Sequence, residues 1–362
     1  MFLRATATRR FTEDLASKIH SKLTEFKVSP FGLLQLRVSD CSPKIVPLDS
    51  DKYPDGDRVV VSHCAGCRVE QHQVDFTPVK GYDAKILSMS CTNGEHAEYC
   101  GCSVQVPDKI ALDISAIGDA DVKLKDLQPS HCNISAEYSR VHLHKIKTQN
   151  ANIFANNGSV EITGYLTGNL NIKTGVSGFV RADRLQGSTI NIDTFEGPIS
   201  CKAIYADKVQ LSSRQGNISA SNLQGNVKVW TTDGNVEIGN LEGDMDLSMG
   251  RGSLNASVSD TKRLKIYSLE GNVLLGLNDS IRASLKFDSP HHIVTENLDV
   301  ELSSSKDESQ GELSHKSHGK LNAAGSDAPQ IEVTAKKGTI KLRGTSWLSS
   351  LNLTMKEPQS IA

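Results

Sequence analysis

The chain has 362 residues, a formal net charge of −2 and only 5% aromatic residues. The near-neutral charge excludes the basic footprint of a nucleic-acid-binding domain, so no nucleic acid is expected as a partner. No apolar run approaches the roughly 20 residues of a membrane-spanning helix, and we expect no transmembrane span.

Residues 1–30 are predicted to be a targeting segment. Three arginines, Arg4, Arg9 and Arg10, precede the first acidic residue, Glu13. Apolar residues then recur every fourth position, which predicts an amphipathic helix, at Phe11, Leu15, Ile19 and Leu23. An arginine-rich, acid-poor, amphipathic start is typical of a mitochondrial transit peptide. The alternative is an ordinary capping helix and a cytoplasmic protein.

Residues 31–109 are predicted to form a small, cysteine-rich β cap. Residues 33–38, 58–62 and 104–107 have the apolar runs of strands, and Pro54-Asp55-Gly56 predicts a turn. A repeat that stacks strands leaves its end exposed, and such an end needs covering. We therefore expect this segment to close one end of the repeat that follows it.

The cap holds the best candidates for metal chemistry. Cys64-Ala-Gly-Cys67 has the spacing of a zinc knuckle, and Cys100-Gly-Cys102 follows it. Four thiolates from two short loops could close a tetrahedral zinc site, so a structural zinc at Cys64, Cys67, Cys100 and Cys102 is one hypothesis. The second pair departs from the Cys-x-x-Cys spacing. Unmodified thiols, disulfides in an oxidising compartment and a redox pair are the alternatives.

Residues 110–302 are predicted to form the repeat region, and from about residue 158 to 276 one short phrase restarts every nine or ten residues. The phrase is a glycine followed by polar and apolar residues in alternation, as in Gly225-Asn-Val-Lys-Val229 and Gly234-Asn-Val-Glu-Ile238. The alternation predicts a strand with one buried face, and the glycine predicts a corner. In five copies the next residue is an asparagine that tolerates left-handed geometry and can bond its own backbone, namely Asn169, Asn217, Asn226, Asn235 and Asn272.

Two classes of corner alternate along this repeat. One reads leucine, any residue, glycine, as in Leu223-Gln-Gly225, and the other is more polar, as in Thr232-Asp-Gly234. The unit is therefore about 18–19 residues with two strands per coil, and the fold class is an all-β, single-stranded stacked β-solenoid with a thin aliphatic core. The alternative is an antiparallel meander with a hairpin at each glycine.

The pattern is interrupted and then resumes near the C-terminus. Residues 303–330 are rich in Ser, Lys, Asp, Gly and His and lack apolar periodicity, which predicts a flexible polar insert. The alternation returns at Ile331-Glu-Val333 and at Gly338-Thr-Ile-Lys-Leu342. Residues 331–362 are therefore expected to supply closing strands and a tail.

Together these features resemble the β-solenoid domain family known as "putative adhesin", a family without an established function. The resemblance is carried by Val104-Gln-Val-Pro107, by Gly118-Asp119 and by the glycine–asparagine coils up to Gly276. The polar insert and Thr345-Ser-Trp-Leu-Ser-Ser-Leu351 resemble an uncharacterised animal member, which implies a mitochondrial setting. The family name describes architecture and implies no adhesion and no catalytic residues.

The leading functional hypothesis is a non-enzymatic scaffold that binds an unknown protein along a face of the solenoid, with self-association if a cap is weak. Polar residues predicted to point outward are the candidates for contact, namely Lys228, Glu237, Asp246 and Asn255. The alternatives are a zinc-binding or thiol-redox accessory protein and a carbohydrate-active β-helix enzyme. His142-Leu143-His144 has strand spacing and puts both rings on one face, either as surface residues or as a metal pair.

Overall fold

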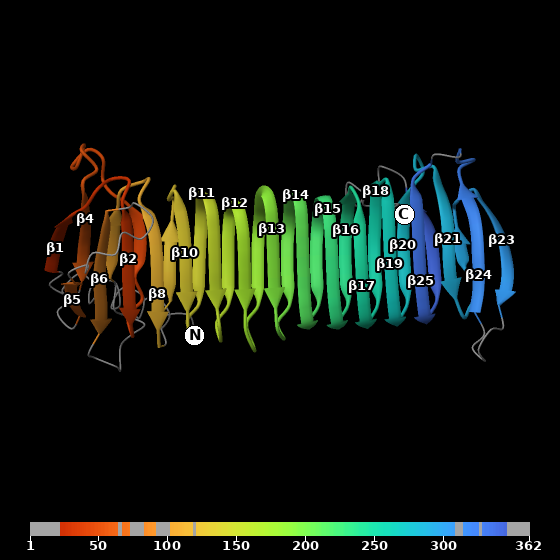
Figure 1. Ribbon diagram of the computed structural model, residues 1–362, viewed down its shortest axis with the longest axis horizontal. Coiled ribbons are helices and arrows are strands. Elements are labelled where there is room, and N and C mark those ends of the chain that lie inside the picture. The colour runs from red at the N-terminus through yellow and green to blue at the C-terminus, as the bar shows by residue number, and fades with distance from the viewer. Residues whose placement is uncertain are drawn as a thin grey trace, which may run out of the picture. The chain divides into compact units, whose positions relative to one another are not determined.

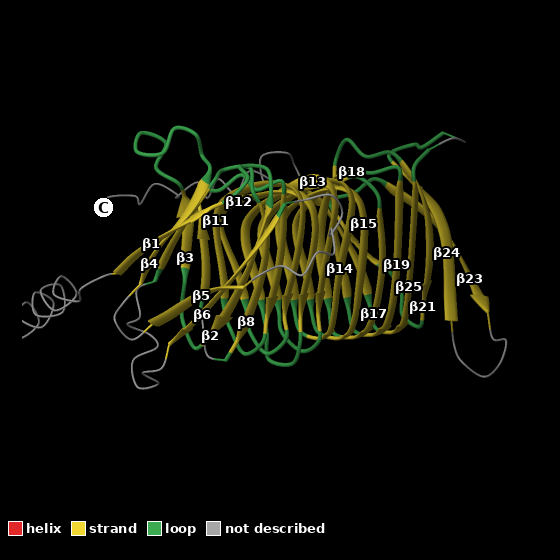
Figure 2. Ribbon diagram, turned by 60° about the vertical axis from the view of Figure 1, so that its left-hand side comes forward, coloured by secondary structure: helices red, strands yellow, loops and turns green. Residues whose placement is uncertain are grey.

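The computed structural model describes residues 22–63, 67–72, 83–91, 102–118, 121–307, 314–325 and 328–345. These residues form strands joined by turns and loops, and no helix occurs among them (Figure 2). None of them forms a helix that is long and apolar enough to cross a membrane. The chain divides into two units, Met1–Gly178 and Phe179–Ala362.

In the described part of the first unit the strands are β1 (Lys22–Lys27), β2 (Leu33–Ser39), β3 (Lys44–Pro47), β4 (Arg58–His63), β5 (Cys67–His72), β6 (Ala84–Cys91), β7 (Ser103–Val106), β8 (Ala111–Ile117), β9 (Val122–Lys125), β10 (His131–Ala136), β11 (Val141–Ala155) and β12 (Val160–Thr174).

In the described part of the second unit they are β13 (Val180–Thr194), β14 (Ile199–Gln215), β15 (Ile218–Asp233), β16 (Val236–Glu242), β17 (Met245–Arg251), β18 (Leu254–Asp260), β19 (Arg263–Glu270), β20 (Val273–Asn278), β21 (Ala283–Ser289), β22 (Val294–Glu296), β23 (Val300–Asp307), β24 (Ser314–Leu321), β25 (Gln330–Lys337) and β26 (Ile340–Thr345).

Parallel pairing between successive coils builds each unit (Figure 1). In the first unit Val141 pairs with Val160, and in the second Ile218 pairs with Val236. Side chains on neighbouring coils accordingly bond across 19 or 18 residues. Parallel strands cannot be joined by the two-residue hairpins of a meander, so the coil prediction is confirmed and the hairpin alternative is wrong.

The core lies inside the coils and is mainly aliphatic. On β17, Met245, Leu247 and Met249 are buried whereas Asp246 and Ser248 between them are exposed. Val227, Met245, Leu264, Ile331 and Leu285 form one inward column, each on a strand that pairs with the next. One coil alone would leave this row in water, and the neighbouring coils bury it.

The N-terminal part of the first unit is a cap of antiparallel strands on parallel coils. Strand β4 pairs antiparallel with β1 and β7, and β5 pairs antiparallel with β6. The Tyr53 hydroxyl donates to the Glu25 carboxylate at 2.5 Å, and Arg58 donates to it at 3.1 Å. These bonds lower the pKa of Glu25 and connect β1 to the loop before β4.

At the start of the chain the structure corrects the helix prediction at one position. Leu23 lies in strand β1 because the backbone from Lys22 to Lys27 pairs with the edge of β4. Its side chain is 54% exposed. The rest of the predicted helix, which includes Phe11, Leu15 and Ile19, lies outside the described residues, as do Arg4, Arg9 and Arg10.

At the other end, the order of coils in space departs from the order in sequence. Strand β25 pairs parallel with β19 on one side and with β21 on the other, so it lies between two strands that precede it in the chain (Figure 1). Strand β26 pairs in the same way with β20 and β22. Residues 330–345 therefore form an internal coil, which corrects the prediction of a closing strand.

The segment predicted as a flexible polar insert, residues 303–330, contains strand β24 and most of strand β23. Strand β24 pairs antiparallel with β21 and with β23, so a hairpin covers the edge that β21 presents (Figure 2). Apolar periodicity failed as a signal here because an edge hairpin is held by backbone hydrogen bonds and needs no fully buried face. Lysines are common in such edge strands, where they discourage pairing with other chains.

Candidate functional site

Two of the four predicted zinc ligands are brought together in the cap, and a third cysteine joins them. The sulfur atoms of Cys41, Cys67 and Cys102 all lie within 4.8 Å of one another. Cys64 and Cys100 lie outside the described residues. Cys41 was missed because it has no second cysteine within a few residues, and only the crowding of cysteines in this part of the chain pointed to it.

The three thiols are buried at the ends of different strands. Cys41 follows β2, Cys67 begins β5, and Cys102 immediately precedes β7. Their exposed fractions are 0%, 7% and 1%. The sulfur atoms of Cys67 and Cys102 are 3.2 Å apart, and those of Cys41 and Cys67 are 4.0 Å apart. Both distances exceed the roughly 2.05 Å of a disulfide bond, so neither pair is joined by a disulfide.

Cys132 and Cys201 occupy a different environment. Each lies on the inner side of a coil, in β10 and β14, among aliphatic side chains. Burial raises the pKa of both thiols to about 12. Neither belongs to the group of three. They act as small apolar core residues.

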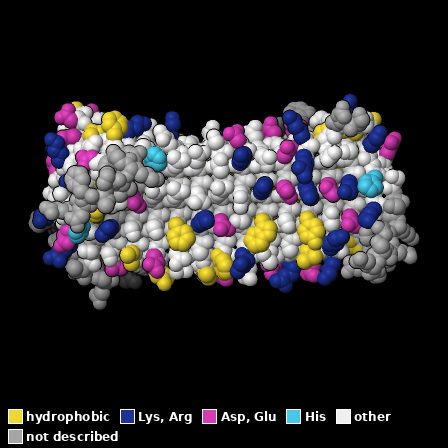
Figure 3. Space-filling view, viewed as in Figure 1, with side chains coloured by type: hydrophobic (Ala, Val, Ile, Leu, Met, Phe, Trp, Pro, Cys, Tyr) yellow, Lys and Arg dark blue, Asp and Glu magenta, His cyan; other side chains and the backbone are white. Residues whose placement is uncertain are grey.

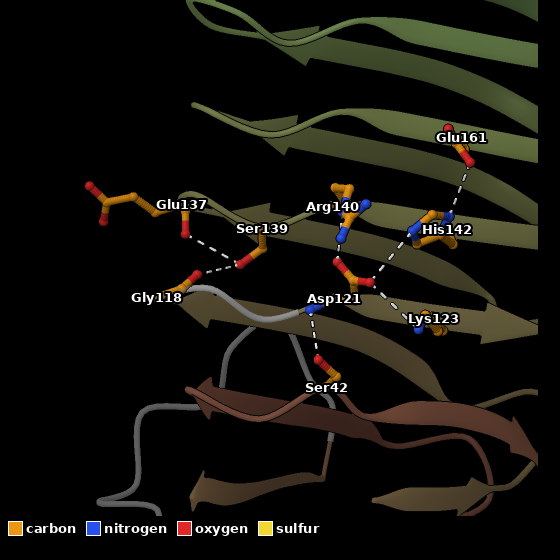
Figure 4. Close-up of polar contacts among 9 residues, drawn as sticks. All are labelled: Ser42, Gly118, Asp121, Lys123, Glu137, Ser139, Arg140, His142 and Glu161. Carbon is orange, nitrogen blue, oxygen red and sulfur yellow. Dashed lines mark hydrogen bonds and ion pairs between the residues drawn. The ribbon is translucent and has the colours of Figure 1, made fainter. Parts of the chain in front are cut away.

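His142 and His144 point outward from β11 on either side of the buried Leu143, as the strand spacing predicted. In Figure 4 the His142 ring lies between two carboxylates, with Nδ1 3.3 Å from Glu161 and Nε2 3.9 Å from Asp121. Asp121 also contacts Arg140 at 3.1 Å and Lys123 at 3.5 Å. This carboxylate is shared between Lys123 and Arg140, an arrangement that fits a surface charge network better than a metal site.

All four polar residues predicted to face outward are exposed. They lie on two separate ladders of paired strands, one through β15 and β17 and the other through β16 and β18. Lys228 on β15 pairs with Asp246 on β17. Glu237 on β16 pairs with Asn255 on β18. The two pairs therefore cannot serve one small contact patch together.

The ladder of β15, β17 and β19 carries large apolar side chains that sequence reasoning did not single out. Trp230 is 46% exposed, Tyr267 38% and Leu269 42%. Trp230 pairs with Ser248, and Ser248 pairs with Tyr267, so a serine separates the two aromatic rings. We call this surface the β15–β19 outer face and define it by Lys228, Trp230, Asp246, Ser248, Lys265, Tyr267 and Leu269.

Figure 3 shows hydrophobic side chains standing among charged and other polar ones on the surface it presents. On the β15–β19 outer face the charged members form a column of alternating sign, in which Asp246 is flanked by Lys228 and Lys265. The column continues through Glu332 to Lys286, which are joined at 3.0 Å. Opposite charges on adjacent strands stabilise the pairing of the coils. The column of Trp230, Ser248 and Tyr267 beside them carries the aromatic side chains of this face.

Arginines stack on other aromatic rings of the second unit. The Arg214 guanidinium lies 4.7 Å from the centre of the Phe195 ring, and that of Arg184 lies 5.9 Å from the Tyr205 ring. Both distances are within the range of a cation–π interaction. The outward surface of this unit thus presents arginine and aromatic side chains held in defined positions.

A polar groove of about 640 Å³ lies in the other ladder of the second unit. Among the residues described there, its walls include Ser221, Asn240, Ser259 and Arg343, and Glu237 is its one carboxylate. Glycosidases generally need two carboxyl groups placed across the scissile bond. The groove therefore does not reproduce the pair expected of a carbohydrate-active enzyme.

Comparison with known proteins gives one family. Residues 89–197 and residues 167–343 each match Toastrack DUF4097. Among solved structures, a putative cell adhesion protein from Clostridium sporogenes aligns with 90% of this chain and 100% of its own, at 10% identity and a TM-score of 0.18. A putative adhesin from Bacteroides fragilis aligns with 90% of this chain and 97% of its own, at 11% identity and a TM-score of 0.23.

Proposed function

Since the chain belongs to the Toastrack DUF4097 family, we propose that it is a non-enzymatic β-solenoid scaffold that binds another protein. The contact surface is the β15–β19 outer face. The observation that carries the proposal is the exposure of Trp230 and Tyr267 at outward positions of a ladder whose other outward residues are largely polar.

The residue types on this face support a protein partner. Tryptophan, tyrosine and arginine are the side chains most enriched among residues that dominate binding energy at protein interfaces. Their rings bury a large area and lose few rotamers on binding. Trp230 and Tyr267 meet this description because both lie on regular strands that fix their positions.

The spacing of the two rings defines what the partner must offer. Neighbouring strands lie about 4.8 Å apart, and two strand spacings place the Trp230 and Tyr267 backbones about 9.6 Å apart. Ser248 between them has a short side chain, which leaves room for one apolar side chain of a partner. The alternating charges of Lys228, Asp246 and Lys265 would form a polar rim along one side.

The test is capture of the partner by cross-linking. Tagged full-length protein is gently cross-linked in cells and purified, and the captured proteins are quantified by mass spectrometry. We expect one protein captured in a fixed ratio to the wild type. The double variant Trp230→Ala/Tyr267→Ala should reduce its capture at least tenfold, because truncating a hot-spot residue costs about 2 kcal/mol or more.

The matched control is Glu237→Ala/Asn255→Ala, which removes two outward side chains from the other ladder. It should capture the partner as the wild type does. If the aromatic variant captures the partner and the control variant does not, the contact surface would be the one that carries Glu237 and Asn255. Equal capture by the wild type and both variants would overturn the proposed surface.

Mitochondrial import, and with it the narrower resemblance to an animal member of the family, is a separate proposal. It is supported by the arginine-rich, acid-poor segment before Glu13. Residues 1–30 fused to a fluorescent reporter should direct it to mitochondria, and replacing Arg4, Arg9 and Arg10 by glutamine should abolish import. A reporter that stays in the cytoplasm would contradict the proposal.

A further inference from the structure

We propose that Cys41, Cys67 and Cys102 form a structural metal site in the N-terminal cap and that its ion is zinc. The inference is independent of the β15–β19 outer face, because the three thiols belong to the first unit and that face belongs to the second. It begins from three buried thiols brought together by segments separated by 26 and 35 residues.

The geometry of the three sulfur atoms fits three of the four ligand positions around a tetrahedral ion. A zinc–sulfur bond of about 2.3 Å places two sulfurs of one tetrahedron about 3.8 Å apart. The two pairs described above, at 3.2 Å and 4.0 Å, lie on either side of that length. All three sulfurs lie within 4.8 Å of one another, so a small adjustment of side-chain torsions would place one ion in contact with each of them.

Backbone pairing fixes the positions of the three ligands. The Lys44 amide donates to the Cys102 carbonyl at 2.8 Å, which joins the start of β3 to the residue before β7. The Asp40 amide donates to the Ile117 carbonyl, which holds the turn before Cys41 against the next coil. Cys67 pairs opposite Cys91 in the antiparallel ladder of β5 and β6. A site held in this way needs little reorganisation to bind an ion.

Two strands of the cap are largely exposed, and a crosslink would help to hold them. Strands β1 and β5 lie mostly exposed, with Leu23 and several charged side chains in water. Leu48, Tyr53 and Val60 form a cluster of buried residues that joins β4 to the loop before it. A structural metal would join these segments, and its binding free energy would contribute directly to folding.

Burial favours the metal over a redox role for these thiols. A redox-active cysteine must react with a substrate or a reductant from outside the protein, so it has to be accessible to solvent. At 7% exposure or less, none of the three thiols offers that access in the folded cap. A borderline-soft, closed-shell ion such as Zn²⁺ accepts thiolate ligands well and stabilises their ionised form.

The test measures metal in the full-length protein purified without chelator. We expect inductively coupled plasma mass spectrometry to find one zinc per chain. The variants Cys41→Ser and Cys102→Ser should each lose the zinc, while Cys132→Ser, which alters a buried thiol outside the cluster, should retain it. Zinc at background level in the wild type, or full zinc in both cluster variants, would overturn the site.

A second measurement covers variants that fail to fold. Wild-type protein is reloaded with Co²⁺, and thiolate ligation should give intense charge-transfer absorption in the near ultraviolet. Cobalt binding without that absorption would exclude thiolate ligands. Copper in place of zinc in the purified protein would overturn the choice of ion, and an intact mass showing an oxidised pair of cysteines would overturn the metal site in favour of a disulfide.

Discussion

At the corners of the second unit, glycine is required by close approach between coils. A Cβ atom on Gly252 would lie 2.2 Å from the carbonyl oxygen of Gly234, one coil earlier. Gly252 also has a φ of +129°, in the region that favours glycine. A Cβ atom on Gly271 would meet the carbonyl of Gly252 in the same way, and one on Gly338 would meet that of Gly271. The coil of β25 and β26 therefore continues the column of glycines formed by the earlier coils.

Gly252→Ala should therefore lower the free energy of unfolding by more than about 1 kcal/mol, because the new methyl group meets a backbone carbonyl and the φ is unfavourable. Urea unfolding followed by circular dichroism measures the change. The matched control is Gly325→Ala, where an added Cβ has nothing within 4 Å. An equal effect at both positions would show that the close approach between coils does not determine the loss.

The asparagines after these glycines act between coils. The Asn217 side-chain oxygen accepts the amide of Asn235, and the Asn235 oxygen accepts the amide of Ser253, both at 2.9 Å. Asn272 accepts the amide of Thr339 at 3.1 Å in the same way. The sequence predicted a corner at these positions, but local turn rules suggested a bond within one coil. A contact with the next coil cannot be read from a single repeat.

Asn235→Ala should lower the free energy of unfolding by about 1 kcal/mol, since it removes the acceptor for the Ser253 amide. Asn235→Asp keeps an oxygen acceptor and should recover most of the loss at neutral pH. Asn255→Ala, on an outward position of β18, serves as the control. A destabilisation by the aspartate variant as large as that by alanine would argue against the ladder bond.

The buried thiols give a pH dependence with a definite sign. Burial raises the pKa of Cys132 and Cys201 from 9.0 to about 12, so both stay protonated in the folded state while the unfolded chain ionises. Their contribution to stability is complete below pH 9.0 and is lost as the pH rises toward 12. Each thiol should cost about 1.4 kcal/mol per pH unit in that interval.

Urea unfolding of the wild type and of Cys132→Ala/Cys201→Ala measures this dependence. The two conditions are about pH 7.5 and about pH 10.5, which lie on either side of the pKa of 9.0 that a thiol has in the unfolded chain. The wild type should lose more stability between the two conditions than the variant does. Identical losses would mean that neither thiol stays protonated in the folded protein.

At the scale of elements, the chain returns to insert a coil among earlier ones. The Lys337 ammonium lies 2.8 Å from Glu270 and connects β25 to β19, and this contact lowers the pKa of the Glu270 carboxyl. On its other side β25 is joined to β21 by the Lys286–Glu332 pair. The sequence predicted the strands of this coil from their alternation. Which strands lie beside β25 depends on contacts such as that of Lys337 with Glu270, which are 67 residues apart in the sequence. No local sequence pattern encodes such a contact.

The inserted coil predicts a specific pattern of hydrogen exchange. Val333→Ala removes a fully buried side chain from β25, which should cost roughly 1–3 kcal/mol and loosen both neighbours. Amide exchange measured by mass spectrometry should accelerate in residues 263–270 and in residues 283–289. Leu302→Ala in β23 should accelerate exchange in β24 and leave residues 263–270 unchanged. If Val333→Ala accelerates exchange in only one of β19 and β21, the position of β25 between those two strands would be contradicted.

At the scale of the whole molecule, the sequence predicted the architecture better than the sites. The coil period and the inward rows follow from glycine corners and from alternation, which are local and repeated many times. The aromatic pair on the β15–β19 outer face was missed because Trp230 and Tyr267 are 37 positions apart in the printed sequence and become neighbours only through the coil register. Cys41 was also missed because it lies 26 residues from Cys67 in the sequence and meets it only in the folded cap.

The central claim is that this face binds a protein, and photo-cross-linking from Ser248 tests it most directly. A photoreactive residue replaces Ser248, which lies between Trp230 and Tyr267, and in a parallel sample replaces Glu237 on the other ladder. Cross-linked peptides are then identified by mass spectrometry. We predict cross-links from position 248 to one partner protein and few from position 237. No cross-link from position 248, or the same products from both positions, would contradict the account.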